Sequence, residues 1–306
     1  MKFSGVMTAI VTPMTNGAVD EAALRGLVRA QLEGGVSGLV ACGSTGEAAT
    51  LTASEQSRVV RVVVDEVSGR VPVIAGVGAR STHGAVAEAE RGAEAGADAL
   101  LVVTPAYNKP TQEGLLAHFR AVADAVELPN ILYNVPGRTA CDLKPDTVAD
   151  LSEHPRIVGI KEATGDLTRA ADIRRVVPSD FALLSGDDFT YLPFIATGSD
   201  GCISVLSNVA PARLVAIDAA ARAGRRADAL AQHLALLPLM HALFVESNPI
   251  PVKTAAAWLG VIPGAELRLP LTALTQDGAD VLEGALLAAG LHPVRTPGAP
   301  STMGPS

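Results

Sequence analysis

Residues 72–104 read PVIAGVGARSTHGAVAEAERGAEAGADALLVVT, and this stretch decides the fold of the chain. Two short apolar runs, 72–77 and 99–104, lie on either side of an alanine-rich segment that follows Ser81 and ends at Gly96. Serine is a preferred helix N-cap, and glycine is common at helix ends. Both runs are apolar throughout, which is typical of parallel strands covered on both faces. The stretch therefore predicts a strand, a helix and a second strand parallel to the first.

The same unit repeats along the chain. Asp20 precedes one further helical pattern, and Thr52 and Glu55 form a capping box before another. Eight alternating strands and helices predict an α/β protein with a (β/α)8 TIM barrel. A doubly wound open sheet is the alternative, but the G-x-G-x-x-G turn typical of that fold is absent from the sequence. The eight apolar runs are residues 6–11, 38–42, 72–77, 99–104, 130–134, 157–161, 181–185 and 202–206.

The chain continues well beyond the eighth run, to residue 306. Residues 1–224 are predicted to form the barrel, which is the catalytic domain, because α/β barrels are routinely that long. Helical patterns in residues 225–292 predict a C-terminal helical extension that packs on the barrel. The remaining segment, 293–306, is rich in Pro, Gly, Ser and Thr, so we expect a disordered tail.

Composition restricts the class of protein. Hydrophobic residues make up 48% of the chain and charged residues 18%, which excludes disorder over most of its length. Lys and Arg number 24 against 32 Asp and Glu, a net charge of -8. An acidic chain is a poor partner for nucleic acid or an anionic membrane, although a local basic pocket for an acidic substrate is compatible with this charge.

The three cysteines, Cys42, Cys141 and Cys202, favour a reducing compartment over a disulfide framework. No Cys or His spacing typical of a zinc site is present, so we expect no metal. The apolar run at the N-terminus ends at Pro13 and is too short for a signal peptide, and no run reaches the ~20 residues of a membrane helix. We therefore expect a cytoplasmic protein.

Barrel enzymes carry their chemistry at the carboxyl ends of the strands. After the second run comes GSTGE, residues 43–47, where the hydroxyls of Ser44 and Thr45 lie on a glycine-flanked turn. Backbone N–H groups in such a turn can hold a carboxylate. The alternative is an ordinary capping turn, and the missing Gly-Lys-Ser/Thr ending excludes a P-loop.

Lys161 ends the otherwise apolar run 157–161. A buried ammonium is costly unless it is paired or used, and a neutral lysine can attack a carbonyl as a Schiff-base nucleophile. The alternative is a lysine that points outward or pairs with Glu162.

Two of the three tyrosines, Tyr107 and Tyr133, also follow or end a run. Arg138 lies five residues beyond Tyr133 and could bind a carboxylate through its guanidinium fork. The alternatives are half-buried packing for the tyrosines and an exposed loop position for the arginine. Asp187 and Asp188, after the seventh run, favour helix capping over a metal site and argue against a phosphate pocket. The combination predicts an unphosphorylated carbonyl acid as substrate.

Three motifs in this order resemble the dihydrodipicolinate synthase / N-acetylneuraminate lyase family: GSTGE (43–47), YNVPGRT (133–139) and GIKEATGDLTR (159–169). The resemblance covers roughly residues 1–292. Four further stretches resemble the dihydrodipicolinate synthase branch in particular: VTPMT (11–15), PVIAGVGA (72–79), SGDD (185–188) and FVESNPIPVK (244–253).

The resemblance implies a (β/α)8-barrel class I aldolase that condenses pyruvate with L-aspartate 4-semialdehyde to 4-hydroxy-tetrahydrodipicolinate, on the diaminopimelate and lysine pathway. It implies a covalent imine between pyruvate and a lysine, and no cofactor. The alternative within the family is a 2-keto-3-deoxy sugar acid aldolase or a sialic acid lyase, which generally lacks an arginine matching Arg138. A non-catalytic barrel is a third alternative, against which the intact motifs argue.

The resemblance also implies roles for individual residues. Lys161 matches the Schiff-base lysine and Tyr133 the general acid/base. Ser44, where the family usually has threonine, and Tyr107 match a proton relay. Because the relay tyrosine comes from a neighbouring subunit, a homo-oligomer is implied, commonly a tetramer built as a dimer of dimers. Among the substrate contacts, Thr45, Gly186 and Ile203 match positions near pyruvate, Ile203 through its backbone, and Arg138 matches the residue that holds the semialdehyde carboxylate.

Many relatives are inhibited by lysine, which binds between two subunits. The matching positions in sensitive relatives usually carry His at 53 and 56, Glu at 84 and Tyr at 106, with Asn at 80. This chain has Ala53, Gln56, Gly84, Ala106 and Arg80 instead. The resemblance therefore implies that lysine does not inhibit this protein.

Overall fold

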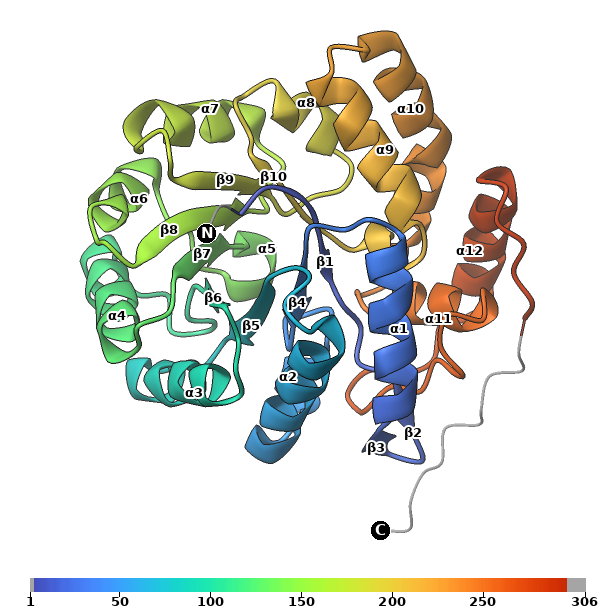
Figure 1. Cartoon of the computed structure of the whole chain (residues 1–306), viewed down its shortest axis with the longest axis horizontal. Helices are drawn as coiled ribbons and strands as arrows, with labels where there is room; N and C mark the ends of the chain where they lie inside the picture. The colour runs from blue at the N-terminus through green and yellow to red at the C-terminus, as the bar shows by residue number, and fades with distance from the viewer. Residues whose placement is uncertain (1–2, 296–306) are drawn as a thin grey trace.

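The computed structural model describes residues 3–295, and their strands close into a barrel (Figure 1). Neighbouring barrel strands are parallel throughout, in the order β1-β10-β9-β8-β7-β6-β5-β4. The predicted TIM barrel is confirmed, and each of the eight apolar runs overlaps one barrel strand. These strands are β1 (Gly5–Ala9), β4 (Gly38–Ala41), β5 (Val73–Val77), β6 (Ala99–Val103), β7 (Asn130–Asn134), β8 (Ile157–Glu162), β9 (Ala182–Ser185) and β10 (Gly201–Ser204).

A ring of helices surrounds the strands (Figure 1). The side chains of Asp20, Thr52 and Ser81 accept hydrogen bonds from the first-turn amides of α1, α2 and α3, as their N-cap positions predict. The helices of the barrel are α1 (Glu21–Glu33), α2 (Ala53–Val67), α3 (Thr82–Glu94), α4 (Gln112–Ala125), α5 (Pro136–Thr139), α6 (Pro145–Ser152), α7 (Leu167–Val176), α8 (Tyr191–Ile195) and α9 (Pro211–Arg222). Short elements complete it: the hairpin β2 (Met14–Thr15) and β3 (Ala18–Val19), and the 3-10 turns η1 (Ala48–Thr50) and η2 (Leu206–Asn208).

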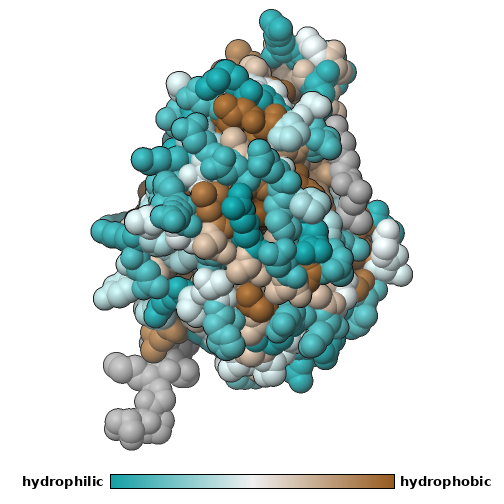
Figure 2. All heavy atoms as spheres, turned by 90° about the vertical axis from the view of Figure 1, so that its left-hand side faces the viewer, coloured by the Kyte–Doolittle hydropathy of each residue, from teal (hydrophilic) through white to brown (hydrophobic). Residues whose placement is uncertain are grey.

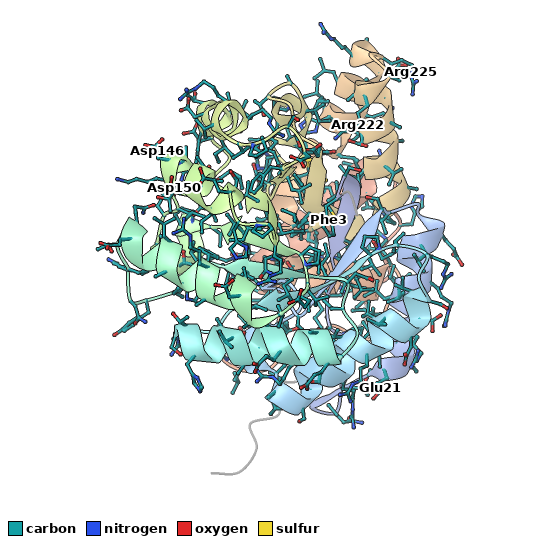
Figure 3. The ribbon with its side chains drawn as sticks, turned by 60° about the vertical axis from the view of Figure 1, so that its left-hand side comes forward. Phe3, Glu21, Asp146, Asp150, Arg222 and Arg225 are labelled. Atoms are coloured by element: carbon teal, nitrogen blue, oxygen red, sulfur yellow. The ribbon has the colours of Figure 1, made fainter. Side chains whose placement is uncertain are left out.

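The core has two layers, which explains why the strands are apolar on both faces. One layer fills the barrel interior and includes Met7, Val40 and Leu184. The larger layer lies between the strands and the helices. Figure 3 shows Phe3 centrally among the strands, whereas Asp146 and Asp150 lie at the outer edge of α6.

Three helices follow the barrel: α10 (Arg226–Ala242), α11 (Ile250–Trp258) and α12 (Gln276–Ala288). Helix α10 packs against α9 and α12, and α11 packs against α12 and η2, so these helices extend the barrel on one side (Figure 1). The division at residue 224 stays a prediction. Most of the predicted tail, residues 296–306, lies outside the described residues.

The outer surface over the left-hand side of Figure 1 is mainly hydrophilic, with small, separate hydrophobic areas (Figure 2). Within residues 3–295, no helix is long and apolar enough to cross a membrane. The three cysteines are buried and unpaired.

Candidate active site

Lys161 and Tyr133 lie directly opposite each other on the adjacent strands β8 and β7. Because neighbouring residues in register point to the same face of a sheet, both side chains face the barrel interior. The Lys161 Nζ atom lies 4.3 Å from the centroid of the Tyr133 ring. Only 5% of Lys161 and 8% of Tyr133 is exposed. A potential nucleophile and a potential proton donor therefore meet in one nearly dry place.

Glu162 has its own partners. Its Oε2 atom accepts hydrogen bonds from Asn134 Nδ2 at 3.0 Å and Arg169 Nε at 3.1 Å, and its Oε1 atom accepts one from the backbone N–H of Thr164 at 2.8 Å. These bonds hold the carboxylate on the opposite side of β8 from Lys161. The alternative of a Lys161–Glu162 pair is wrong, because successive residues of a strand point to opposite faces.

Gly186 follows β9 and borders the lysine. A Cβ atom at this position would lie 2.9 Å from Lys161 Cε and 2.6 Å from Ala163 Cβ. The backbone N–H of Gly186 donates to the Glu162 carbonyl at 2.7 Å, which fixes this close approach. The missing side chain therefore leaves the space that the Lys161 side chain occupies.

The GSTGE turn joins β4 to η1. Ser44 is exposed, whereas Thr45 is buried and accepts a hydrogen bond on Oγ1 from Asn248 Nδ2 at 2.9 Å. Thr12 Oγ1 donates to the Gly46 carbonyl at 2.7 Å and holds the turn against the chain after β1. The two hydroxyls thus differ, since one is fixed by a neighbour and the other faces solvent.

Glu47 ends this turn with a left-handed backbone, φ 57°, and its carboxylate is fully buried. Its Oε1 atom lies 2.5 Å from Nζ of Lys253, which is also fully buried. Burial lowers the pKa of Lys253 from its usual value, and the charge of Glu47 opposes this effect. The pair attaches the turn to α11, although the two residues are 206 positions apart in the chain.

Arg138 lies on α5 and is exposed. Its Nη2 atom donates to the backbone carbonyl of Asn248 at 3.0 Å. Asn248 therefore contacts both Thr45 and Arg138, the first through its side chain and the second through its backbone. Sequence reasoning assigned no role to Asn248. The available signal was its place in the FVESNPIPVK stretch, where a polar residue precedes proline among apolar residues.

The remaining predicted residues divide into two groups. Ile203, on β10, is 1% exposed and belongs to the same interior layer as Tyr133. Tyr107 instead is 85% exposed and has a positive φ of 76°, with its backbone N–H bonded to the Thr139 carbonyl at 3.3 Å. The fold brings together Lys161, Tyr133, Gly186 and Ile203 around the barrel interior but presents Tyr107 outward.

Asp187 and Asp188 differ in their surroundings. Asp187 Oδ2 accepts from the backbone N–H of Thr190 at 3.2 Å, ahead of α8. Asp188 Oδ2 accepts from the N–H groups of Val205 and Leu206, each at 2.9 Å, and burial raises the pKa of this carboxyl. Asp188 therefore fixes the backbone just after β10. Within the described part of the chain, no group of three or more His, Cys, Asp or Glu side chains is arranged to hold a metal ion.

The fold and the site define a (β/α)8-barrel enzyme with an interior lysine beside a tyrosine at the carboxyl ends of adjacent strands. The model of the dihydrodipicolinate synthetase family matches residues 2–289, and the chain belongs to this family.

Individual relatives agree with this assignment. The 4-hydroxy-tetrahydrodipicolinate synthase of Nitratidesulfovibrio vulgaris (strain DP4) is 49% identical over 292 residues, which is 95% of this chain and 100% of that protein. A chloride-inhibited dihydrodipicolinate synthase from Acinetobacter baumannii, solved with pyruvate, has a TM-score of 0.91 and 45% identity, covering 94% of this chain and 99% of that one. A relative from Cyanidioschyzon merolae, solved with lysine bound, has a TM-score of 0.91 and 42% identity, covering 94% of this chain and 99% of that one.

Proposed function

We propose that this protein condenses pyruvate with L-aspartate 4-semialdehyde to 4-hydroxy-tetrahydrodipicolinate through an imine on Lys161. The observation that carries the proposal is the position of Lys161 Nζ, inside the barrel and 4.3 Å from the Tyr133 ring centre. Relatives at about half identity carry the name of this synthase, and one solved relative was crystallised with pyruvate.

The chemistry follows from an amine beside a phenol. Lys161 Nζ attacks the C2 carbonyl of pyruvate and water leaves, giving the imine. Loss of a proton from the pyruvate methyl group gives an enamine, whose carbon attacks the aldehyde carbon of the semialdehyde, and the aldehyde oxygen takes up a proton. The amino group of the added substrate then attacks C2, closes the ring and releases Lys161, so that one water is lost overall.

Each of these steps moves a proton, and a positioned acid/base accelerates such transfers. We assign that role to Tyr133, with Ser44 and Tyr107 as hydroxyls that relay the proton. Tyr107 is 85% exposed, so its side chain is available to a partner subunit. The proposal includes a homo-oligomer, a dimer of dimers, as the resemblance implies.

Carboxylate recognition completes the assignment. Thr45, the adjoining loop amides and the backbone of Ile203 would hold the pyruvate carboxylate, and Gly186 would leave room for the imine. Arg138 would bind the semialdehyde carboxylate through its guanidinium. This arginine favours the synthase over the sugar acid aldolase and lyase alternatives.

We also infer that the enzyme needs no metal or redox cofactor, because the imine itself withdraws the electrons that an aldol reaction requires. A cytoplasmic location is in keeping with three buried, unpaired cysteines.

The decisive test is borohydride reduction in the presence of pyruvate, followed by peptide mapping. The adduct is expected on Lys161, to be lost in Lys161→Ala, and to persist in Lys144→Ala, which removes an exposed lysine. A coupled assay then compares aspartate semialdehyde with sugar aldehydes. Trapping on another lysine, or turnover confined to sugar aldehydes, would overturn the proposal.

A further inference from the structure

We propose that Asn248 is a positioning residue that aims the Thr45 hydroxyl and holds Arg138, so that the carboxylates of the two substrates are bound in a fixed relation. The inference rests on the proposed function, because it takes Thr45 and Arg138 as the groups that bind those carboxylates. Neither the motifs nor the likeness to relatives assigned a role to Asn248.

The first step is the direction of the Thr45 hydrogen. A hydroxyl carries one hydrogen and can accept through its oxygen. Because Asn248 Nδ2 donates to Thr45 Oγ1 at 2.9 Å, the oxygen is already paired and the hydrogen is free for another acceptor. Thr45 is 4% exposed and Asn248 is 6% exposed, so water competes little for either group. A substrate carboxylate is the acceptor that this hydrogen lacks.

The second step is the attachment of Arg138. Its Nη2 atom donates to the Asn248 backbone carbonyl at 3.0 Å. A guanidinium has five N–H donors in a planar fork, so one bond to a carbonyl leaves donors for a carboxylate. Arg138 is otherwise an exposed side chain on a short helix, and this bond restricts its position.

The third step is the rigidity of Asn248 itself. It precedes α11, the helix that carries Lys253, and Lys253 pairs with Glu47 at 2.5 Å. The GSTGE turn is therefore tied to this segment at two points, through Thr45 and through Glu47. Two attachments from one segment leave Asn248 little freedom to turn away from Thr45.

The side chain of Asn248 has one further feature. Its Oδ1 atom is buried and has no hydrogen-bond partner in the described part of the chain. Asn130 shares this feature: it is 2% exposed, its Nδ2 atom donates to the Leu128 carbonyl at 2.8 Å, and its Oδ1 atom is also without a partner. Asn130 begins β7, at the end of the barrel opposite the site, and is thus a matched control for the loss of a buried asparagine.

The experiment measures the pyruvate concentration for half-maximal borohydride trapping, and the semialdehyde KM, in the full-length chain. In Asn248→Ala, Lys161 is still trapped at saturating pyruvate, but the half-maximal pyruvate concentration rises about 3- to 10-fold, as expected for one lost hydrogen bond. The semialdehyde KM changes less, because the backbone carbonyl that accepts from Arg138 remains in the variant. In Asn130→Ala both values stay at the wild-type level, whatever the change in thermal unfolding.

A second pair of variants tests whether Asn248 acts through Thr45. Thr45→Val raises the half-maximal pyruvate concentration, and adding Asn248→Ala to it causes no further rise, because residues that act on one another are not additive. Additive effects, or an Asn248→Ala protein whose values match the wild type, would overturn the inference. Absence of any Lys161 adduct in the wild-type protein would instead overturn the proposed function, so the two failures are distinguishable.

Discussion

The ion pair between Glu47 and Lys253 joins the turn after β4 to the helix α11, with both side chains fully buried. Glu47 follows the two hydroxyl residues of the GSTGE turn, and Lys253 follows Asn248 by five positions. A buried pair is weak evidence for stability, because desolvation of two charges offsets most of their attraction. The consequence of this pair is instead conformational. The position of the GSTGE turn depends on the position of α11 in the C-terminal extension, so the extension is part of the site.

Removing one charge of this pair is therefore predicted to be more harmful than removing both. Lys253→Met leaves the Glu47 carboxylate buried without its cation, and the free energy of unfolding should fall by about 3–5 kcal/mol. In the double variant Glu47→Gln, Lys253→Met the loss should be smaller than in Lys253→Met alone. Urea unfolding measures both values. A double variant less stable than Lys253→Met would contradict the assignment of a buried pair.

Gly186→Ala is predicted to impair imine formation. The added methyl carbon would lie 2.9 Å from Lys161 Cε and 2.6 Å from Ala163 Cβ, closer than atoms in contact tolerate. Overpacking of this kind costs about 1–3 kcal/mol and should move the lysine, slowing trapping by roughly 10-fold or more. The measurement is the rate of borohydride trapping at saturating pyruvate.

Gly284→Ala is the control for this change, since its Cβ on α12 would meet no atom within 4 Å outside the adjoining backbone of that helix. It should leave trapping unchanged and stabilise the helix slightly. Equal trapping rates for the Gly186→Ala and wild-type proteins would show that the space beside Lys161 is not needed.

Arg138→Ala is predicted to weaken the use of semialdehyde and to leave pyruvate trapping nearly normal. Arg138 is exposed and binds the backbone of Asn248, not the side chain that bonds to Thr45, so its loss need not disturb Thr45. A lost charge-assisted contact to a carboxylate costs about 1.5–3 kcal/mol, which is roughly 10- to 150-fold in kcat/KM for semialdehyde. Arg138→Lys should be intermediate, because it keeps the charge without the fork. Unchanged kcat/KM in Arg138→Ala would remove the arginine from the site.

The pH dependence of stability should include a contribution from Glu55. Hydrogen bonds from Arg268 are the main cause that lowers the Glu55 pKa from 4.5 to about 2. A carboxyl whose pKa is lower in the folded state stabilises fully above its unfolded pKa, and the contribution is lost as pH falls toward the folded pKa. Because Glu55 is 21% exposed, we expect about 1–3 kcal/mol.

Glu55→Gln isolates this effect, since glutamine can keep the capping box with Thr52. The difference in unfolding free energy between the wild type and Glu55→Gln should be constant above about pH 4.5 and should shrink toward zero near pH 2. Glu113→Gln, in the first turn of α4, is the control charge removal. A difference that is independent of pH between 2 and 6 would contradict the role of Arg268.

The strand positions and Lys161 could be predicted from the sequence because both depend on local pattern. An apolar run that ends in lysine can be recognised from its own residues, without knowing what packs around it, and Lys161 is indeed buried at the end of β8. Asn248 could not be found in this way. Its partner Thr45 lies 203 positions away in the chain, and only the folded chain brings them to 2.9 Å. The roles of Tyr107 and Arg138 stay predictions, because they depend on molecules that a single chain does not include.

The last prediction is that L-lysine does not inhibit this protein at millimolar concentration, although a relative 42% identical to it was solved with lysine bound. A lysine site needs an acidic group for the ammonium and an apolar wall for the side chain. At the positions that the resemblance implies, this chain presents the exposed cation Arg80, the small Ala106, and Gly84 in place of the acid. Gly84 is also built into the packing, since a Cβ there would lie 2.9 Å from Ala79 Cβ. A guanidinium near a cationic ligand repels it. Enzyme activity in roughly 1–10 mM lysine should therefore equal the activity measured without lysine, because binding worth less than about 4 kcal/mol does not saturate a site at 1 mM. Half-maximal inhibition below about 1 mM, the concentration that corresponds to about 4 kcal/mol of binding, would contradict the prediction.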